Sequence, residues 1–139
     1  MQWTIEQLHN WEELRPYVDT ALLPLYLYQP SLGIPAHAER MTYLLNVAAA
    51  VEQRLKGRIL LFPLLYQIGD AGRELMLPEG FRHYILLQFS GHLVKGILPE
   101  GEGRIHSFPI GDEDLASPLR FDVTVDVLYK EVLKVWENQ

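Results

Sequence analysis

The chain has 139 residues, of which 48% are hydrophobic and 22% are charged, and its formal net charge is −6. This composition excludes a disordered chain, and the length suits one domain, so we expect residues 1–139 to form a single α/β domain. The absence of cysteine excludes disulfides, thiolate nucleophiles and cysteine-bound metals. Because the chain is acidic and has no basic stripe, we expect no nucleic-acid partner.

The N-terminal segment lacks the features of a signal peptide. Residues 1–17 have no basic start and carry Glu6, Glu12 and Glu13 where a signal peptide is apolar. The longest uncharged stretch, Thr20 to Ala38, is interrupted by prolines and a glycine, so it does not form the roughly 20-residue apolar span of a membrane helix. We therefore expect a cytoplasmic protein without membrane insertion.

A helix is predicted at the N-terminus, followed by the first strand. Thr4 is a suitable N-cap, and apolar side chains then recur every third residue up to Leu14, so the helix should end before Pro16. The segment Tyr17–Leu27 is filled with apolar residues and is expected to be extended. Gln29–Pro35 contains two prolines and a glycine, which predicts a loop.

The most regular helical pattern lies between two similar apolar runs. After residue 36, apolar side chains recur on one helical face, and the helix is expected to end near Gly57 (Met41, Leu44, Ala48, Val51 and Leu55). The flanking runs, Ala21–Tyr26 and Ile59–Tyr66, are each interpreted as a strand that ends at a proline. Because continuous apolar runs are typical of strands covered on both faces, the three segments predict a strand–helix–strand unit.

Two more strands and a terminal helix are predicted after residue 80. Tyr84–Phe89 and Arg104–Phe108 have strand patterns, the second ending before a proline. Residues 92–98 fit either a short helix or a strand that forms a hairpin with the strand at Arg104. The last segment is interpreted as a helix that starts at Ser117 and Pro118, because its helical stripe is longer than its alternating pattern.

Together these elements predict an α/β fold. We expect one three-layer domain with a mostly parallel sheet of about four strands and helices on both faces. An α+β fold with a central antiparallel meander is the alternative.

A candidate pocket is expected at the carboxyl ends of the strands. Ligands of open parallel sheets bind at this edge, and the residues predicted there are Tyr26, Tyr66, Ser90 and His92. The simpler interpretation is that the tyrosines close the end of the core with their hydroxyls in water. For Ser90 and His92 the simpler interpretation is a turn, because no Gly-x-Ser-x-Gly elbow surrounds the serine.

The sequence predicts neither a metal site nor a cofactor. The five histidines lack the paired spacing of metal ligands, and Gly101-Glu102-Gly103 is not a phosphate-binding loop because no Gly-Lys-Ser or Gly-Lys-Thr follows it. Asp19 precedes the first strand, at the end opposite the candidate pocket, and is interpreted as a structural residue.

Several segments resemble the YpiF-like family of uncharacterised proteins from Gram-positive, spore-forming bacteria. They are the run Tyr17-Val18-Asp19-Thr20-Ala21 followed by Leu-Leu-Pro-Leu, the tripeptide Lys56-Gly57-Arg58, the run Gly80-Phe81-Arg82-His83, and a C-terminal helix that ends in tryptophan. The resemblance implies a cytosolic α/β domain and supplies no catalytic residues.

Two functions are compatible with these patterns. The first is a non-enzymatic protein-interaction or regulatory module that binds an unknown protein partner or forms a homo-oligomer, for which an apolar surface patch rimmed by charge is expected. The second is a small-molecule binder or hydrolase-like enzyme with a pocket near the four candidate residues. The missing catalytic set favours the first.

Overall fold

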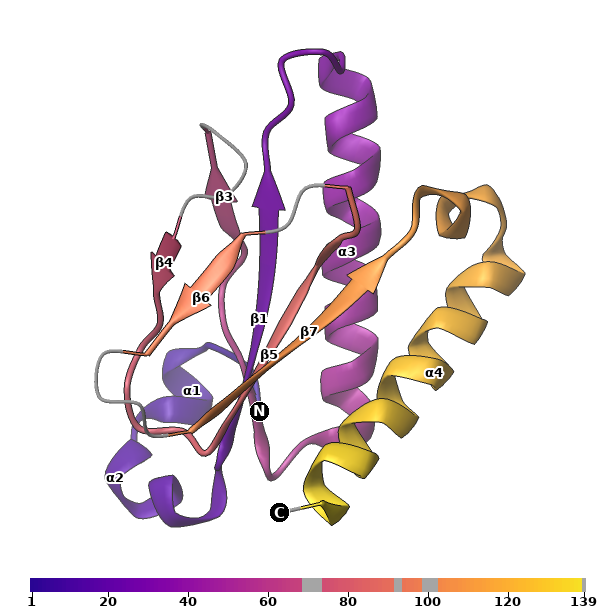
Figure 1. Ribbon diagram of the computed structural model, residues 1–139. Coiled ribbons are helices and arrows are strands. Elements are labelled where there is room, and N and C mark those ends of the chain that lie inside the picture. The colour runs from indigo at the N-terminus through magenta and orange to yellow at the C-terminus, as the bar shows by residue number, and fades with distance from the viewer. Residues whose placement is uncertain (69–73, 92–93, 99–102, 139) are drawn as a thin grey trace.

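The computed structural model describes residues 1–68, 74–91, 94–98 and 103–138 (Figure 1). Its helices are α1 (Ile5–Leu8), α2 (Trp11–Leu14), α3 (Ile34–Leu55) and α4 (Pro118–Glu137), with the 3-10 turns η1 (Arg15–Tyr17) and η2 (Asp112–Ala116). Its strands are β1 (Thr20–Leu27), β2 (Ile59–Leu61), β3 (Leu65–Gln67), β4 (Glu74–Met76), β5 (His83–Phe89), β6 (Lys95–Ile97) and β7 (Arg104–Ile110).

The strands form a five-stranded sheet and a separate pair. The sheet has the order β2–β1–β5–β7, and β3 pairs with β1 beyond the end of β2. Strands β4 and β6 form the pair. All these pairings are parallel, which confirms the predicted α/β sheet, and the alternative antiparallel meander is wrong. Of the two alternatives for residues 92–98, the structure has a strand, β6, at residues 95–97, but this strand pairs with β4 and forms no hairpin with β7; residues 92 and 93 lie outside the described residues.

The first strand does not end at its proline. β1 continues through Pro24 to Leu27, contrary to the prediction. Alternate backbone groups of a strand point to opposite neighbours. The N–H of Thr20 donates to the carbonyl of Arg58 before β2, whereas the carbonyl of Asp19 accepts from the start of β5. Residue 24 has the same parity as residue 20, so the missing N–H of the proline faces β2 and β3.

A bulge lies opposite this proline. β2 pairs with β1 up to Leu61 and β3 resumes the pairing at Leu65, so three residues stand opposite two residues of β1. Pro63 is the middle one of the three. Both prolines therefore lie where the ladder is interrupted, which explains how Pro24 is tolerated inside a central strand.

Helices α3 and α4 cover the first face of the sheet (Figure 1). The stripe predicted for α3 is buried against β1, β2 and β5 at Leu44, Ala48, Val51 and Leu55. The predicted C-terminal helix is confirmed as α4, and the hydroxyl of its N-cap Ser117 accepts a hydrogen bond from the backbone of the first turn.

The second face is covered by α1, α2 and the β4–β6 pair, so helices lie on both faces as predicted. The N-terminal helix is not continuous, because Asn10 leaves the helical conformation and starts α2. Leu8 of α1 and Trp11 of α2 both pack against the core of this face. The predicted cap is present, since the Thr4 hydroxyl accepts the N–H of Gln7.

Candidate functional site

The carboxyl ends of β1 and β5 form the topological switch point of the sheet. The chain passes from β1 outward to β2 and then returns across β1 to β5. Ligands of open α/β sheets bind at such points, outside the carboxyl ends of the strands. Tyr26 at the end of β1 and Phe89 at the end of β5 meet there edge to face, with ring centroids 6.3 Å apart.

A buried tyrosine–histidine pair occupies this edge. The Tyr26 hydroxyl lies 2.5 Å from Nδ1 of His37, and Nε2 of the histidine lies 2.9 Å from the carbonyl of Gln29. Because a carbonyl oxygen only accepts hydrogen bonds, Nε2 of His37 donates to it. In the neutral imidazole, Nδ1 is then unprotonated and accepts a hydrogen bond from the Tyr26 hydroxyl. Burial raises the pKa of Tyr26, although the positive charge of the neighbouring Arg40 opposes the rise.

Arg40 lies beside the carboxyl ends of β1, β5 and β7. Its Nη1 lies 2.7 Å from Oδ1 of Asp112, which follows β7, and its guanidinium lies 4.4 Å from the ring centroid of Phe89. The side chain is buried, and within the described residues its Nε has no hydrogen-bond partner. The edge is thus filled by a network of buried polar and aromatic groups around Tyr26.

The structure brings together some of the predicted pocket residues. Tyr66 stacks on Tyr26 with centroids 6.1 Å apart and an interplanar angle of 8°. Ser90 is exposed, and its N–H donates to the carbonyl of Ile110, so its backbone is fixed by the sheet. His92 lies outside the described residues.

Sequence reasoning missed His37 and Arg40. Both lie on the buried face of α3 and continue the apolar stripe of Met41 and Leu44 toward the start of the helix. Polar residues in register with an apolar stripe were the available signal, because such residues are buried and need partners.

The segments that carry the family resemblance meet at the opposite edge of the sheet. Asp19 accepts two hydrogen bonds from Arg58, at 2.9 and 3.1 Å, and its carbonyl accepts the N–H of Arg82 at 2.8 Å. Trp136 at the end of α4 donates its indole N–H to the hydroxyl of Thr20 at 2.8 Å. These contacts link the starts of β1, β2 and β5 to the last helix.

The electrostatics of Asp19 fit a structural ion pair. Burial disfavours its charged form, but the hydrogen bonds from Arg58 and Thr20 outweigh this effect and lower its pKa. The guanidinium of Arg58 also lies 4.1 Å from the ring of Trp136. The carboxylate is therefore engaged in holding elements together.

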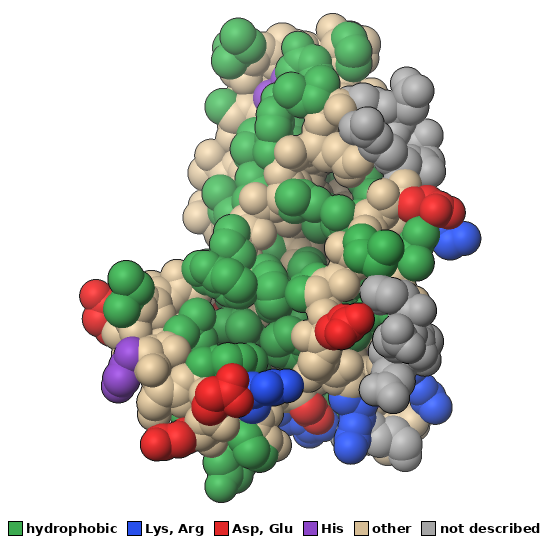
Figure 2. All heavy atoms as spheres, turned by 90° about the vertical axis from the view of Figure 1, so that its left-hand side faces the viewer, with side chains coloured by type: hydrophobic (Ala, Val, Ile, Leu, Met, Phe, Trp, Pro, Cys, Tyr) green, Lys and Arg blue, Asp and Glu red, His purple; other side chains and the backbone are tan. Residues whose placement is uncertain are grey.

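An apolar groove opens on the second face, between α1, α2 and β4 (Figure 2). It consists of two adjoining hollows of about 380 and 310 Å³ that share Trp3, Phe62 and Pro78. We call it the Trp3 groove. Its other lining residues are Leu8, Trp11, Arg15, Leu60, Glu79, Gly80 and Phe81 in the first hollow, and Leu23, Leu25, Pro63, Leu64, Leu65, Leu75, Met76 and Leu77 in the second.

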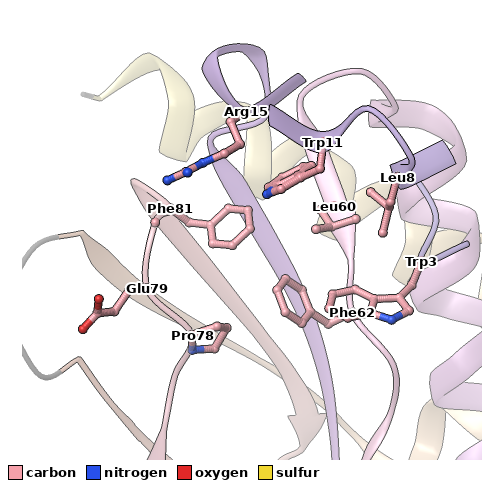
Figure 3. A pocket seen from close by; sticks show the side chains of 10 residues that line it. Trp3, Leu8, Trp11, Arg15, Leu60, Phe62, Pro78, Glu79 and Phe81 are labelled. Atoms are coloured by element: carbon pink, nitrogen blue, oxygen red, sulfur yellow. The ribbon is translucent and has the colours of Figure 1, made fainter. Parts of the chain in front are cut away.

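Aromatic rings form the walls of the first hollow (Figure 3). Trp3 packs on Phe62 with centroids 4.7 Å apart, and Phe81 contacts both Phe62 and Trp11. Trp3 is 51% exposed although it lies among apolar side chains. Charged groups border this hollow at Arg15 and Glu79.

The described residues show neither a metal cluster nor a membrane span. They contain no group of three or more histidines or carboxylates placed to hold a metal ion. Among the helices of these segments, none combines the length and the apolar content that crossing a membrane requires.

Comparison with known proteins identifies a family. The sequence profile of the family described as "Protein of unknown function (DUF2487)" matches residues 9–90, from the start of the α2 region to just past β5. No curated protein and no solved structure matches the chain. The matched segment contributes most of the lining of the Trp3 groove and the pair Tyr26–His37. Because the match covers more than half of the 139 residues, the chain belongs to the DUF2487 family of proteins of unknown function.

Proposed function

We propose that this protein is a non-enzymatic interaction or regulatory module of the cytoplasm, and that it binds a partner through the Trp3 groove. The observation that carries the proposal is a half-exposed tryptophan in an apolar groove bordered by Arg15 and Glu79. Apolar patches rimmed by charge mark interaction sites. Tryptophan is also among the residues that contribute most to binding energy when a partner covers them.

Site-specific photo-cross-linking tests this function. A benzoylphenylalanine residue replaces Trp3 in the full chain expressed in cells, and the matched control carries it in place of Val123, which is 54% exposed on α4. We expect a discrete protein adduct from position 3 that position 123 does not give. Identical adducts at both positions, or none at position 3, would contradict the proposal.

A second candidate function is binding or hydrolysis of a small molecule at the carboxyl edge of the sheet. The observation in its favour is the convergence of Tyr26, His37 and Arg40, since buried polar groups at a switch point are typical of ligand sites. Thermal denaturation with a panel of small carboxylates, phosphates and esters tests it. This candidate requires a ligand that stabilises the native chain and fails to stabilise the Arg40→Met variant.

A further inference from the structure

Within the described residues, the second face of the sheet carries only the short helices α1 and α2, whereas the first face carries the long helices α3 and α4. Parallel sheets are normally covered on both faces by the helices of their crossovers. The crossover from β1 to β2 supplies α3 on the first face. The described parts of the crossovers from β2 to β5 and from β5 to β7 contain only the short strands β3, β4 and β6.

The Trp3 groove lies at this incomplete part of the second layer. Its floor consists of the side chains of Leu23, Leu25 and Leu60 on β1 and β2. Its walls are α1 and α2 on one side and β4 on the other (Figures 2 and 3). An apolar cavity of roughly 150 Å³ accommodates a benzene ring, so each hollow has room for a large apolar side chain.

We propose that the Trp3 groove binds an amphipathic helix of a partner protein, which completes the second layer of the sheet. This inference rests on the function proposed above and specifies its partner. A helix satisfies its own backbone hydrogen bonds, so it can lie on the apolar face of a sheet. Residues spaced by three or four positions along such a helix would enter the two hollows in succession.

An extended peptide fits this location less well. Strand addition needs an open backbone edge, and the edge of β2 beside the groove is already in use. The Met1 amine donates to the carbonyl of Ile59 at 2.9 Å, and the carbonyl of Met1 accepts the N–H of Leu61 at 2.9 Å. This edge of β2 is therefore closed to strand addition.

The charges around the groove specify the flanks of the partner helix. On the α1–α2 wall, exposed Glu6, Glu12 and Glu13 outnumber the exposed Arg15. On the opposite wall, the exposed carboxylate Glu74 of β4 stands beside the exposed Lys95 of β6, and Glu79 follows β4. The excess of negative charge on the α1–α2 wall selects lysine and arginine on the flank of the partner helix that faces this wall, through charge complementarity.

Selection from two displayed peptide libraries of equal length tests this inference. One library presents random residues on a stable helical scaffold, and the other presents them on an extended, proline-containing scaffold. Both are selected against the full chain. We expect binders from the helical library, with large apolar residues at helical spacing and lysine or arginine beside them.

Three variants of the chain make the result specific. Trp3→Glu is expected to weaken the selected helices by ~tenfold or more, whereas Val123→Glu, a matched change on the exposed face of α4, is expected to leave their affinity unchanged. The double variant Glu12→Lys and Glu13→Lys is expected to remove the preference for lysine and arginine. Circular dichroism of each variant verifies that it is folded.

The remaining outcomes overturn the inference. Trp3-dependent binders from the extended library alone, or a fatty acid that displaces the selected helices with higher affinity, would show that the occupant is not a helix. Helical binders unaffected by Trp3→Glu, or no binders from either library, would also contradict it. If position 3 still gives its specific cross-link in cells in those cases, the proposed function stands and only the helical partner is wrong.

Discussion

Single side chains at the amino edge of the sheet connect segments that are far apart in the sequence. Asp19 and Arg58 form a two-point ion pair, and both side chains are mostly shielded from solvent, with 26% and 35% exposure. Hydrogen bonds to a charged group in this setting are stronger than those of surface pairs. The sequence indicated a structural role for Asp19 but could not identify its partner, because the two residues are 39 positions apart.

We expect Asp19→Asn to lower the free energy of unfolding at neutral pH by roughly 1–2 kcal/mol, since the amide accepts less strongly from the guanidinium. The lowered pKa of Asp19 means that the folded state holds the charged form better than the unfolded state does. This stabilisation is therefore complete above the ordinary pKa of 3.8 and is lost as the pH falls below it.

Urea denaturation of both proteins from pH 7 to pH 2.5 measures this effect. The gap between wild type and Asp19→Asn should narrow as the pH falls. Asp126→Asn serves as the control, because this carboxylate also has a lowered pKa, from hydrogen bonding with Lys130, but is accessible to solvent. A gap that stays constant over the acid range would show that the charge of Asp19 is not what stabilises the fold.

The elements were predictable where their patterns were long and local. The 22-residue helix α3 and the 20-residue helix α4 follow directly from their apolar stripes and caps. The course of β1 was not predictable, because a proline inside a central strand is compatible with the sheet only when its neighbour is interrupted at the same height. Here the interruption lies at Pro63, between β2 and β3, and its position opposite Pro24 depends on the register of these strands with β1.

We expect β1 to tolerate proline at position 24, whose N–H would face the interrupted neighbour, and not at position 23, whose N–H faces β5. Pro24→Ala should change the free energy of unfolding by no more than about 1 kcal/mol, because the new N–H faces the interrupted side of the strand. Leu23→Pro should be more destabilising than Leu23→Ala by about 3 kcal/mol or more, because the N–H of residue 23 faces β5.

Equilibrium unfolding in urea compares the three variants. Leu23→Ala is included because Leu23 is buried, and its truncation alone creates a cavity. Equal stabilities of Leu23→Ala and Leu23→Pro would show that the parity of the strand is assigned incorrectly.

At the scale of the whole molecule, the two candidate sites are the carboxyl edge of the sheet and the Trp3 groove on its second face. The carboxyl edge could be located from the sequence, because two apolar runs place Tyr26 and Tyr66 at neighbouring strand ends. His37, Arg40 and Asp112 join them only through tertiary packing. The Trp3 groove could not be predicted from the sequence. It forms because the described parts of the later crossovers contain short strands and no helix that would cover the second face, and no sequence motif indicates this.

The C-terminal helix α4 is attached to the sheet near its last turn. Trp136 joins the last turn of α4 to the sheet through its hydrogen bond to Thr20 and its stacking with Arg58. α4 follows all of the strands and packs mainly on α3 and η2. When the contact of Trp136 is removed, α4 is expected to unfold locally as one unit while the sheet stays folded.

We therefore expect Trp136→Ala to increase amide hydrogen exchange in α4 by ~tenfold or more while exchange in α3 and β5 changes much less. Trp136→Phe should have an intermediate effect, because it keeps an aromatic ring for Arg58 and removes the hydrogen bond to Thr20. Leu119→Ala is the control, since that side chain is 73% exposed at the other end of α4. Hydrogen exchange followed by mass spectrometry resolves the helices separately. A uniform increase across the whole chain would mean that α4 unfolds only together with the sheet.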